Sequence, residues 1–313
     1  MKHDSTTAAG IDVSKTWLDL ALHGREERWR FPNDEPGRAG LVAALVRAGV
    51  ARAGLEASGG YEAAVAAALR EAGLDAIVFQ PRQVRAYAVY RLCRAKTDAI
   101  DASLIAACTA AHGEARAAPD PRLADLAESL RLVEQIDDDL VRLKTRQEAC
   151  RDTRVRARNE GEIKRLKAER ASELKRLAAA IRLHPDLARR LDLVASVPGI
   201  GERTATTLVL RMPELGTLTR EEAASLAGLA PFDRSSGRRD GQRHIAGGRA
   251  DVRTALYAAA LPAAFRWNAA LVDLYRRLRA RGKAHKQALV ACARKLVAYA
   301  NTVLARGTPW KAA

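Results

Sequence analysis

A repeat of aliphatic residues at spacings of three and four constrains the fold more than any other feature of the chain. It consists of Leu123, Leu126, Leu130, Val133, Ile136, Leu140 and Leu143, followed by Ile163, Leu166, Leu174, Leu177 and Ile181. This spacing is typical of the a and d positions of a coiled coil, in which two helices bury an apolar stripe against each other. The charged stretch RARNEGE (156–162) between the two halves predicts a turn, so we expect an antiparallel hairpin of two long helices.

The residues before this repeat show short strand-like runs. Three of them, separated by short polar stretches, are AGIDVS (9–14), WLDLAL (17–22) and ERWRF (27–31). Such runs are typical of a small antiparallel meander. Two further apolar runs, ARAGLEAS (51–58) and DAIVFQP (75–81), alternate with helical patterns. Strands in a meander, followed by strands that alternate with helices, predict a mixed sheet covered by helices.

The length of 313 residues suits two domains and a connection, because single cores stop growing near about 250–300 residues. We expect an α/β domain at 1–115, a coiled-coil connector at 120–185 and a helical domain at 186–313. The four cysteines form no Cys-x-x-Cys pair, which argues against a zinc site and against a disulfide framework.

The formal net charge of +16 is spread along the chain and indicates a phosphate-rich partner, because Lys and Arg side chains release counterions when they contact phosphates. A membrane surface is the competing explanation. The sequence has neither an apolar run of about 18 residues nor the apolar stretch of a signal peptide at its start. We therefore expect a cytoplasmic protein that binds nucleic acid and no membrane.

Four carboxylates are candidates for a metal site. Asp12 lies in the first strand-like run between two apolar residues, Glu56 ends the fourth run, and Asp98 and Asp101 lie one helical turn apart. If the helix that begins near Asp98 packs across the sheet, the four side chains can meet. Carboxylates that close repel one another unless a cation lies among them, and oxygen ligands suit Mg²⁺ or Mn²⁺. Two such ions can hold the attacking and leaving oxygens of a phosphodiester.

The same residues have a structural interpretation. Thr97 can cap a helix whose first turn contains Asp98 and Asp101, since acidic side chains complement the positive end of the helix dipole. Asp12 can be a polar strand residue and Glu56 a strand end. On spacing alone the two interpretations remain open. The basic neighbour Lys96 is expected to contact nucleic acid.

Two segments of the C-terminal half are candidates for nucleic-acid contact. The turn Pro-Gly-Ile-Gly (198–201) separates two helical patterns, and its glycines, Gly199 and Gly201, allow backbone amides to approach a phosphate. Arg203 follows directly. A tight turn between helices without any ligand is the alternative. The second segment, residues 232–251, is rich in Gly, Arg and Ser, and such polar loops often carry function.

In this order, these motifs resemble the DEDD transposases of the insertion-sequence one-ten family, also called bridge-RNA-guided recombinases. The stretches that carry the resemblance are GIDVSKTWLD (10–19), LEASGGYE (55–62), PRQVRAYA (81–88), RAKTDAIDA (94–102), VPGIGERTA (197–205), the segment 226–260 and RLRARGKAHKQALVACARKLV (277–297). They cover nearly the whole chain in colinear order. No single motif is specific, whereas the set is.

The resemblance implies a fold class of α/β plus all-α: a RuvC-like, ribonuclease-H-type domain, a coiled-coil connector and a helical transposase domain with a helix-hairpin-helix turn. It implies that Asp12, Glu56, Asp98 and Asp101 hold the metal, Mg²⁺ or Mn²⁺. It also implies cleavage and joining of donor and target DNA through a covalent phosphoserine, guided by an RNA that the element encodes. The assembled enzyme is expected to be a homo-oligomer, a dimer or tetramer, in which one protomer supplies the quartet and another the serine.

By its position before Gly237, the implied nucleophile is Ser236, with the adjacent Ser235 as the alternative. A free hydroxyl is a poor nucleophile at neutral pH, and no His lies at an obvious spacing for a base. His244 is interpreted as a loop or nucleic-acid contact. The positive side chains expected near the phosphate are Arg238, Arg239 and Arg243.

Two other functions remain as alternatives. A RuvC-like, metal-dependent, structure-selective endonuclease needs the quartet and water but no serine. A nucleic-acid-binding scaffold needs only the basic surface, with structural carboxylates.

Overall fold

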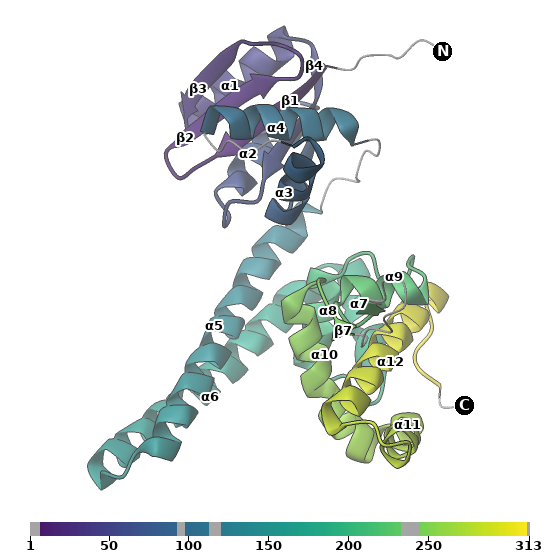
Figure 1. Ribbon diagram of the computed structural model, residues 1–313. Helices are drawn as coiled ribbons and strands as arrows, with labels where there is room; N and C mark the ends of the chain where they lie inside the picture. Colours follow the sequence, from purple (N-terminus) through teal and green to yellow (C-terminus); the bar gives the residue numbers. More distant parts are fainter. Residues whose placement is uncertain (1–6, 93–97, 113–119, 233–243, 312–313) are drawn as a thin grey trace. The chain divides into compact units, whose positions relative to one another are not determined.

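The computed structural model describes residues 7–92, 98–112, 120–232 and 244–311, with residues 98–100 described by their backbone alone. It divides into two compact units, residues 1–119 and 120–313 (Figure 1). Each unit has its own hydrophobic core.

The first unit is built on a five-stranded mixed sheet. Its strands are β1 (Thr7–Val13), β2 (Trp17–Leu22), β3 (Arg28–Pro32), β4 (Val50–Glu56) and β5 (Asp75–Phe79). The order across the sheet is β3-β2-β1-β4-β5; β1, β2 and β3 form an antiparallel meander, and β1, β4 and β5 are parallel. The predicted mixed sheet is thus confirmed, and it is compatible with the RuvC-like fold that the resemblance implies.

Helices cover both faces of this sheet. The elements α1 (Glu35–Arg47) and α2 (Glu62–Glu71) pack on one face, where Ile11 and Leu20 meet Leu41 and Val65. The elements α3 (Pro81–Tyr90) and α4 (Asp98–Ala111) pack on the other face, where Phe79 meets Ile105. Figure 1 shows α4 lying across the sheet. The alternation of side chains along each strand assigns one set of residues to each helical layer.

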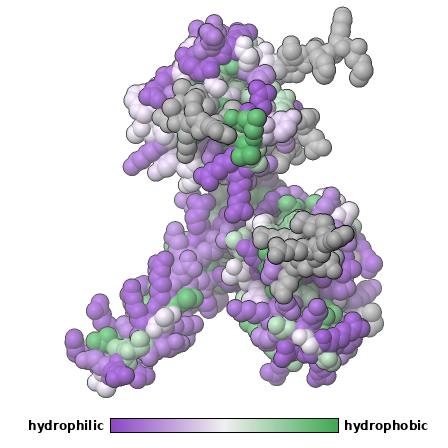
Figure 2. All heavy atoms as spheres, in the orientation of Figure 1, coloured by the Kyte–Doolittle hydropathy of each residue, from purple (hydrophilic) through white to green (hydrophobic). Residues whose placement is uncertain are grey.

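Two long antiparallel helices begin the second unit. They are α5 (Pro121–Ala149) and α6 (Thr153–Arg182), and they pack on each other through Ile136, Leu140 and Leu166. Near the other end of the pair, Leu130 and Ile181 join the core of the helices that follow. The surface of the pair is largely hydrophilic in Figure 2, so its apolar residues lie mainly in the seam between the two helices.

The predicted position of the turn between these helices is wrong. Residues 156–162 are helical, and the break lies at residues 150–152. The Asp152 carboxylate accepts a hydrogen bond from the Val155 amide at 3.0 Å, which caps the start of α6. Gly161 is exposed inside α6, and a glycine there costs only about 1 kcal/mol relative to alanine. That cost is too small to interrupt a long helix whose other residues favour it.

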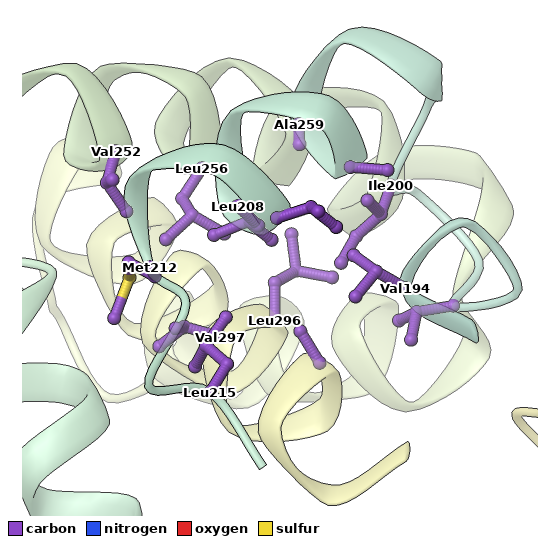
Figure 3. Packing of buried hydrophobic residues seen from close by; sticks show 14 of the residues in the cluster. Val194, Ile200, Leu208, Met212, Leu215, Val252, Leu256, Ala259, Leu296 and Val297 are labelled. Atoms are coloured by element: carbon purple, nitrogen blue, oxygen red, sulfur yellow. The ribbon is translucent and has the colours of Figure 1, made fainter. Parts of the chain in front are cut away.

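In the part of the second unit that the structure describes, six further helices and a short ribbon follow. They are α7 (Pro185–Ala195), α8 (Glu202–Arg211), α9 (Arg220–Leu226), α10 (Ala250–Pro262), α11 (Ala269–Ala280) and α12 (His285–Arg306), with a π-helical stretch, η1 (Ala263–Trp267), after α10. The ribbon consists of β6 (Pro231–Phe232) and β7 (His244–Ile245), which pair antiparallel. Figure 3 shows Leu208, Leu256 and Leu296 from α8, α10 and α12 meeting in the core.

The helix α12 is long and apolar enough to cross a membrane by length and composition alone. Half of its apolar stretch is buried in the protein, and residues such as Cys292 and Leu296 are fully enclosed. These are properties of the core helix of a helical domain.

Candidate functional site

Asp12 and Glu56 lie side by side on neighbouring parallel strands. Ile11 on β1 is in register with Leu55 on β4, so the next residues along the two strands are Asp12 and Glu56. Paired residues of parallel strands point to the same face, and here Ile11 and Leu55 are fully buried against α1 and α2. The two carboxylates therefore belong to the opposite face, and each residue is half-buried there.

That opposite face is covered by α4, and two glycines bring the helix close. A Cβ atom on Gly10 would clash with the backbone of Ala102 and Ala106. A Cβ atom on Gly54 would clash with the Thr109 hydroxyl. Gly10 and Gly54 precede Asp12 and Glu56 by two residues, so α4 contacts the sheet on the same face as the two carboxylates.

The direction of α4 determines which of its ends lies near the carboxylates. Its C-terminal end lies near the start of β4, because Arg52 donates a hydrogen bond from Nη1 to the His112 carbonyl oxygen at 2.7 Å. Thr109 and Ile105 contact Gly54 farther along the strand. The helix therefore crosses β1 and β4 obliquely and in the opposite sense to both strands, so that its N-terminal end lies toward Asp12 and Glu56.

Asp101 lies at this N-terminal end of α4, half-buried, and Asp98 is one turn earlier at the first residue of the helix. The side chain of Asp98 lies outside the described residues. Among the side chains that are described, no three His, Cys, Asp or Glu residues are grouped closely enough to hold a metal ion. The fold thus directs Asp101 toward the strand ends that carry Asp12 and Glu56, but these three alone do not form a metal site.

The chemistry of the donors fits a hard divalent cation. All four candidates are carboxylates, and three of them approach one end of a single sheet face from two strands and one helix. Oxygen ligands of this kind suit Mg²⁺ and Mn²⁺ better than a softer metal.

Sequence reasoning missed a charged group beside Asp12. Asp19 on β2 is in register with Asp12, and Arg30 on β3 donates hydrogen bonds to both Asp19 carboxylate oxygens, at 2.7 and 3.0 Å. The Arg30 guanidinium also lies 5.8 Å from the ring of Trp17, which is 45% exposed. The positive charge of Arg30 thus offsets the negative charge of the Asp19 carboxylate next to Asp12. The alternation within WLDLAL and ERWRF was the signal, since it puts all these side chains on one face.

Ser235 and Ser236 lie outside the described residues, and so do Lys96, Arg238, Arg239 and Arg243. The structure does describe the two short strands that flank residues 233–243 in the sequence, in which Phe232 pairs with His244. His244 is exposed there. The roles of all these residues stay predictions.

The Pro-Gly-Ile-Gly turn lies between α7 and α8, as the sequence predicts. Gly199 has a φ of 99°, and a Cβ atom on it would clash with Ala263, so this glycine serves the packing of the turn on η1. Gly201 precedes the first residue of α8 and has open space around it. Its surroundings leave room for a ligand at the amide end of α8, where an anion is favoured.

Arg203 makes an ion pair instead of pointing freely to solvent. Its guanidinium lies 2.5 Å from the Asp137 carboxylate of α5, and Arg170 of α6 donates to the same carboxylate at 2.9 Å. A neighbouring pair joins Arg211 of α8 to Glu134, whose burial raises its pKa above the usual range. These ion pairs connect α5, α6 and α8. The predicted contact of Arg203 with nucleic acid stays a prediction.

Comparisons with known proteins agree with this architecture. A family model for DEDD-type IS110 proteins, described as a transposase, matches residues 9–152, and a model described as "Transposase IS116/IS110/IS902 family" matches residues 191–277. Together they cover about three quarters of the chain. The first match includes the sheet, α4 and α5; the second includes the helices from α8 to α10 and the ribbon.

Three curated proteins are similar to the chain. The pilin gene-inverting proteins of Moraxella bovis and Moraxella lacunata are each 26% identical over 316 aligned residues, which span 98% of this chain and 98% of theirs. An uncharacterized 43.6 kDa protein of insertion element IS110 from Streptomyces coelicolor is 37% identical over 119 residues, 37% of this chain and 29% of that protein.

A mixed sheet with a carboxylate face, followed by a helical domain and matched by two transposase models, defines the chain as a transposase, an enzyme that cleaves and rejoins DNA. It belongs to the IS110 family of transposases.

Proposed function

We propose that the enzyme cleaves and rejoins DNA with two groups: a divalent-metal site made by Asp12, Glu56, Asp98 and Asp101, and a nucleophilic hydroxyl from Ser236. The observation that supports the metal site is the oblique course of α4 across β1 and β4, which directs its N-terminal end, with Asp101, toward Asp12 and Glu56. Mg²⁺ or Mn²⁺ in that site would stabilise the negative charge on the phosphate oxygens.

The four carboxylates are held in place in two different ways. Asp12 and Glu56 are fixed by paired strands, so their separation changes little, whereas Asp98 and Asp101 depend on the packing of α4. Four carboxylates without a cation would repel one another. The Arg30–Asp19 pair limits this repulsion, because it neutralises the carboxylate in register with Asp12.

Ser236 would act as the covalent nucleophile. Its hydroxyl oxygen attacks the phosphorus of the scissile phosphodiester and loses its proton; the bond from phosphorus to the 3′ oxygen breaks, and that oxygen leaves as a 3′ hydroxyl. The product is a 5′ phosphate bound to Ser236. A 3′ hydroxyl of the partner strand then attacks this phosphoserine, which restores a phosphodiester and the free serine. The positive side chains of Arg238, Arg239 and Arg243 are proposed to hold the phosphate.

The test is to incubate the enzyme with labelled donor and target DNA and Mg²⁺ and to look for DNA that stays bound to denatured protein. Ser236→Ala should abolish the protein-linked 5′ end, while the matched control Ser235→Ala keeps it. Asp12→Asn should abolish both cleavage and linkage. If Ser236→Ala still cleaves and yields a free 5′ phosphate, water is the nucleophile, and the enzyme is a metal-dependent structure-selective endonuclease.

We also propose that a guide RNA encoded by the element selects the DNA sites, that the enzyme works as a dimer or tetramer, and that it does so in the cytoplasm, where chromosomal DNA is accessible. The formal charge of +16 supports an RNA partner in addition to DNA, because both present phosphates. The α5–α6 pair, with Leu132 and Val141 exposed on its surface, is the proposed contact between protomers. Sequencing RNA that co-purifies with the enzyme, together with light scattering, tests both points.

A further inference from the structure

A cavity of about 480 Å³ lies in the second unit, between the β6–β7 ribbon, the end of α11 and α12. Its volume is within the range of about 300–1,000 Å³ typical of small-molecule sites. The lining residues that carry the argument are Leu229, His244, Lys283, Lys286, Val290 and Arg294. None of its described lining residues is a candidate for the metal site.

The charged side chains of the described cavity lining are all positive. Lys283 precedes α12, Lys286 lies in its first turn, and Arg294 follows on the same helix face about two turns after Lys286. Among the residues that the structure describes, no carboxylate lines the cavity, and none of the three cations makes an ion pair with one. The positive electrostatic potential extends along α12 to Lys295. The pKa of Lys295 is lowered mainly by burial and further by the positive charges of Arg220, Arg294 and Arg277. An anion at the rim would relieve this repulsion.

The floor of the cavity is apolar. Leu229 is only 1% exposed, and Val290 and Ala291 of α12 lie beside it. Leu278 and Ile245 add further aliphatic surface from α11 and β7. An apolar floor under a positive rim matches a ligand with a flat ring at one end and a phosphate at the other. A nucleotide has this composition, and the face of a base is bound by apolar contact that is independent of sequence.

We propose that this cavity binds one unstacked nucleotide of single-stranded DNA, with the base against Val290 and Leu229 and the phosphate between Lys286 and Arg294. The site rests on the action of the enzyme on DNA, and it does not depend on which group is the nucleophile. The ribbon that forms one wall flanks residues 233–243 in the sequence. Extrusion of a base favours strands that are already opened.

The experiment measures fluorescence anisotropy of a short single-stranded oligodeoxynucleotide in EDTA, with the full chain carrying Asp12→Asn and Ser236→Ala. No strand cleavage occurs under these conditions, so failure of the proposed chemistry does not affect the result. Val290→Phe fills the floor without changing the charge. It should weaken binding of the intact strand about tenfold, as expected for the loss of one base contact, and leave an abasic strand of the same length unaffected.

Arg294→Gln should weaken the intact and the abasic strand alike, because both carry phosphates. The matched control is Arg276→Gln, which removes one exposed positive charge from the side of α11 opposite Leu278, and it should change the affinity much less. Circular dichroism shows whether each variant is folded, and Ala291→Met serves as a second floor-filling variant if Val290→Phe is not.

Three results would overturn the proposal. The first is that neither Val290→Phe nor Ala291→Met weakens binding of the intact strand. The second is that the protein without a floor substitution binds the abasic and the intact strand with equal affinity, which would mean that only phosphate is bound. The third is an oligoribonucleotide of the same sequence that binds more tightly and responds to Val290→Phe in the same way, which would assign the cavity to RNA.

Discussion

At the residue scale, two glycines set the distance between α4 and the sheet. Gly10 and Gly54 have no side chain to separate β1 and β4 from the helix backbone, so the N-terminal end of α4 can approach the strand ends. The carboxylates contribute oxygen atoms, but the glycines decide whether Asp101 comes near the other two. Neither glycine has a positive φ, so close packing and not backbone conformation is what they provide.

Gly10→Ala should therefore displace α4. The added Cβ would meet the backbone of Ala102 and Ala106, which cannot rotate away as a side chain can. We expect a loss of about 1–3 kcal/mol in the free energy of unfolding and a larger relative loss of DNA cleavage. Urea unfolding and the cleavage assay measure the two effects. An unchanged enzyme would show that α4 does not depend on this contact.

The cysteines permit a second prediction at this scale. Burial raises the pKa of Cys292 to about 11 and also raises the pKa of Cys108. A raised pKa keeps the thiol protonated, so at pH 8 only about one Cys292 in a thousand is a thiolate, the reactive form. Cys150, at the turn between α5 and α6, is half-exposed. Cys93 lies outside the described residues and is replaced by serine for this test. Iodoacetamide should then modify Cys150 before Cys108 and Cys292, as mass spectrometry can show. Rapid modification of Cys292 in the folded protein would contradict its burial.

At the element scale, the sequence predicted most strands and helices correctly. Alternating apolar residues predicted β1, β2 and β3, and the three-and-four spacing predicted α5 and α6. The turn between the two long helices was misplaced, because Gly161 weighed more in that interpretation than the capping carboxylate of Asp152. Local spacing also could not predict the direction of α4, because that direction depends on contacts between residues far apart in the chain. Arg52 and His112 are 60 positions apart, and Gly10 and Ala102 are about ninety apart.

Gly161→Ala distinguishes the two positions of the turn. Inside a helix, with open space around it, an alanine favours the helical backbone and should add about 0.5–1 kcal/mol to the free energy of unfolding. At a turn that needs a glycine, the same substitution would destabilise the protein. Thermal unfolding followed by circular dichroism measures the sign. Asp152→Ala is the companion variant, and the loss of the helix cap should cost about 1 kcal/mol.

At the scale of the whole molecule, composition predicted the class of partner better than it predicted any contact. The excess of positive charge pointed to nucleic acid, and the transposase matches agree with a DNA substrate. The individual contacts were harder to predict, because an arginine in the sequence can serve either phosphate or protein. Arg203 was predicted to contact nucleic acid, and in the structure it forms an ion pair with Asp137. The cavity beside α12 was not predicted, since its walls come from three separate elements.

The charge of the whole chain leads to the last prediction. If contacts to phosphates dominate binding, the affinity for non-specific duplex DNA should fall steeply with salt, because each contact releases condensed counterions. For six to ten contacts we expect a loss of about 10³–10⁵ between about 50 and 200 mM KCl. Anisotropy titrations in EDTA at several salt concentrations give the slope. A tenfold loss or less over this range would mean that most of the +16 charge serves ion pairs and solubility instead of DNA.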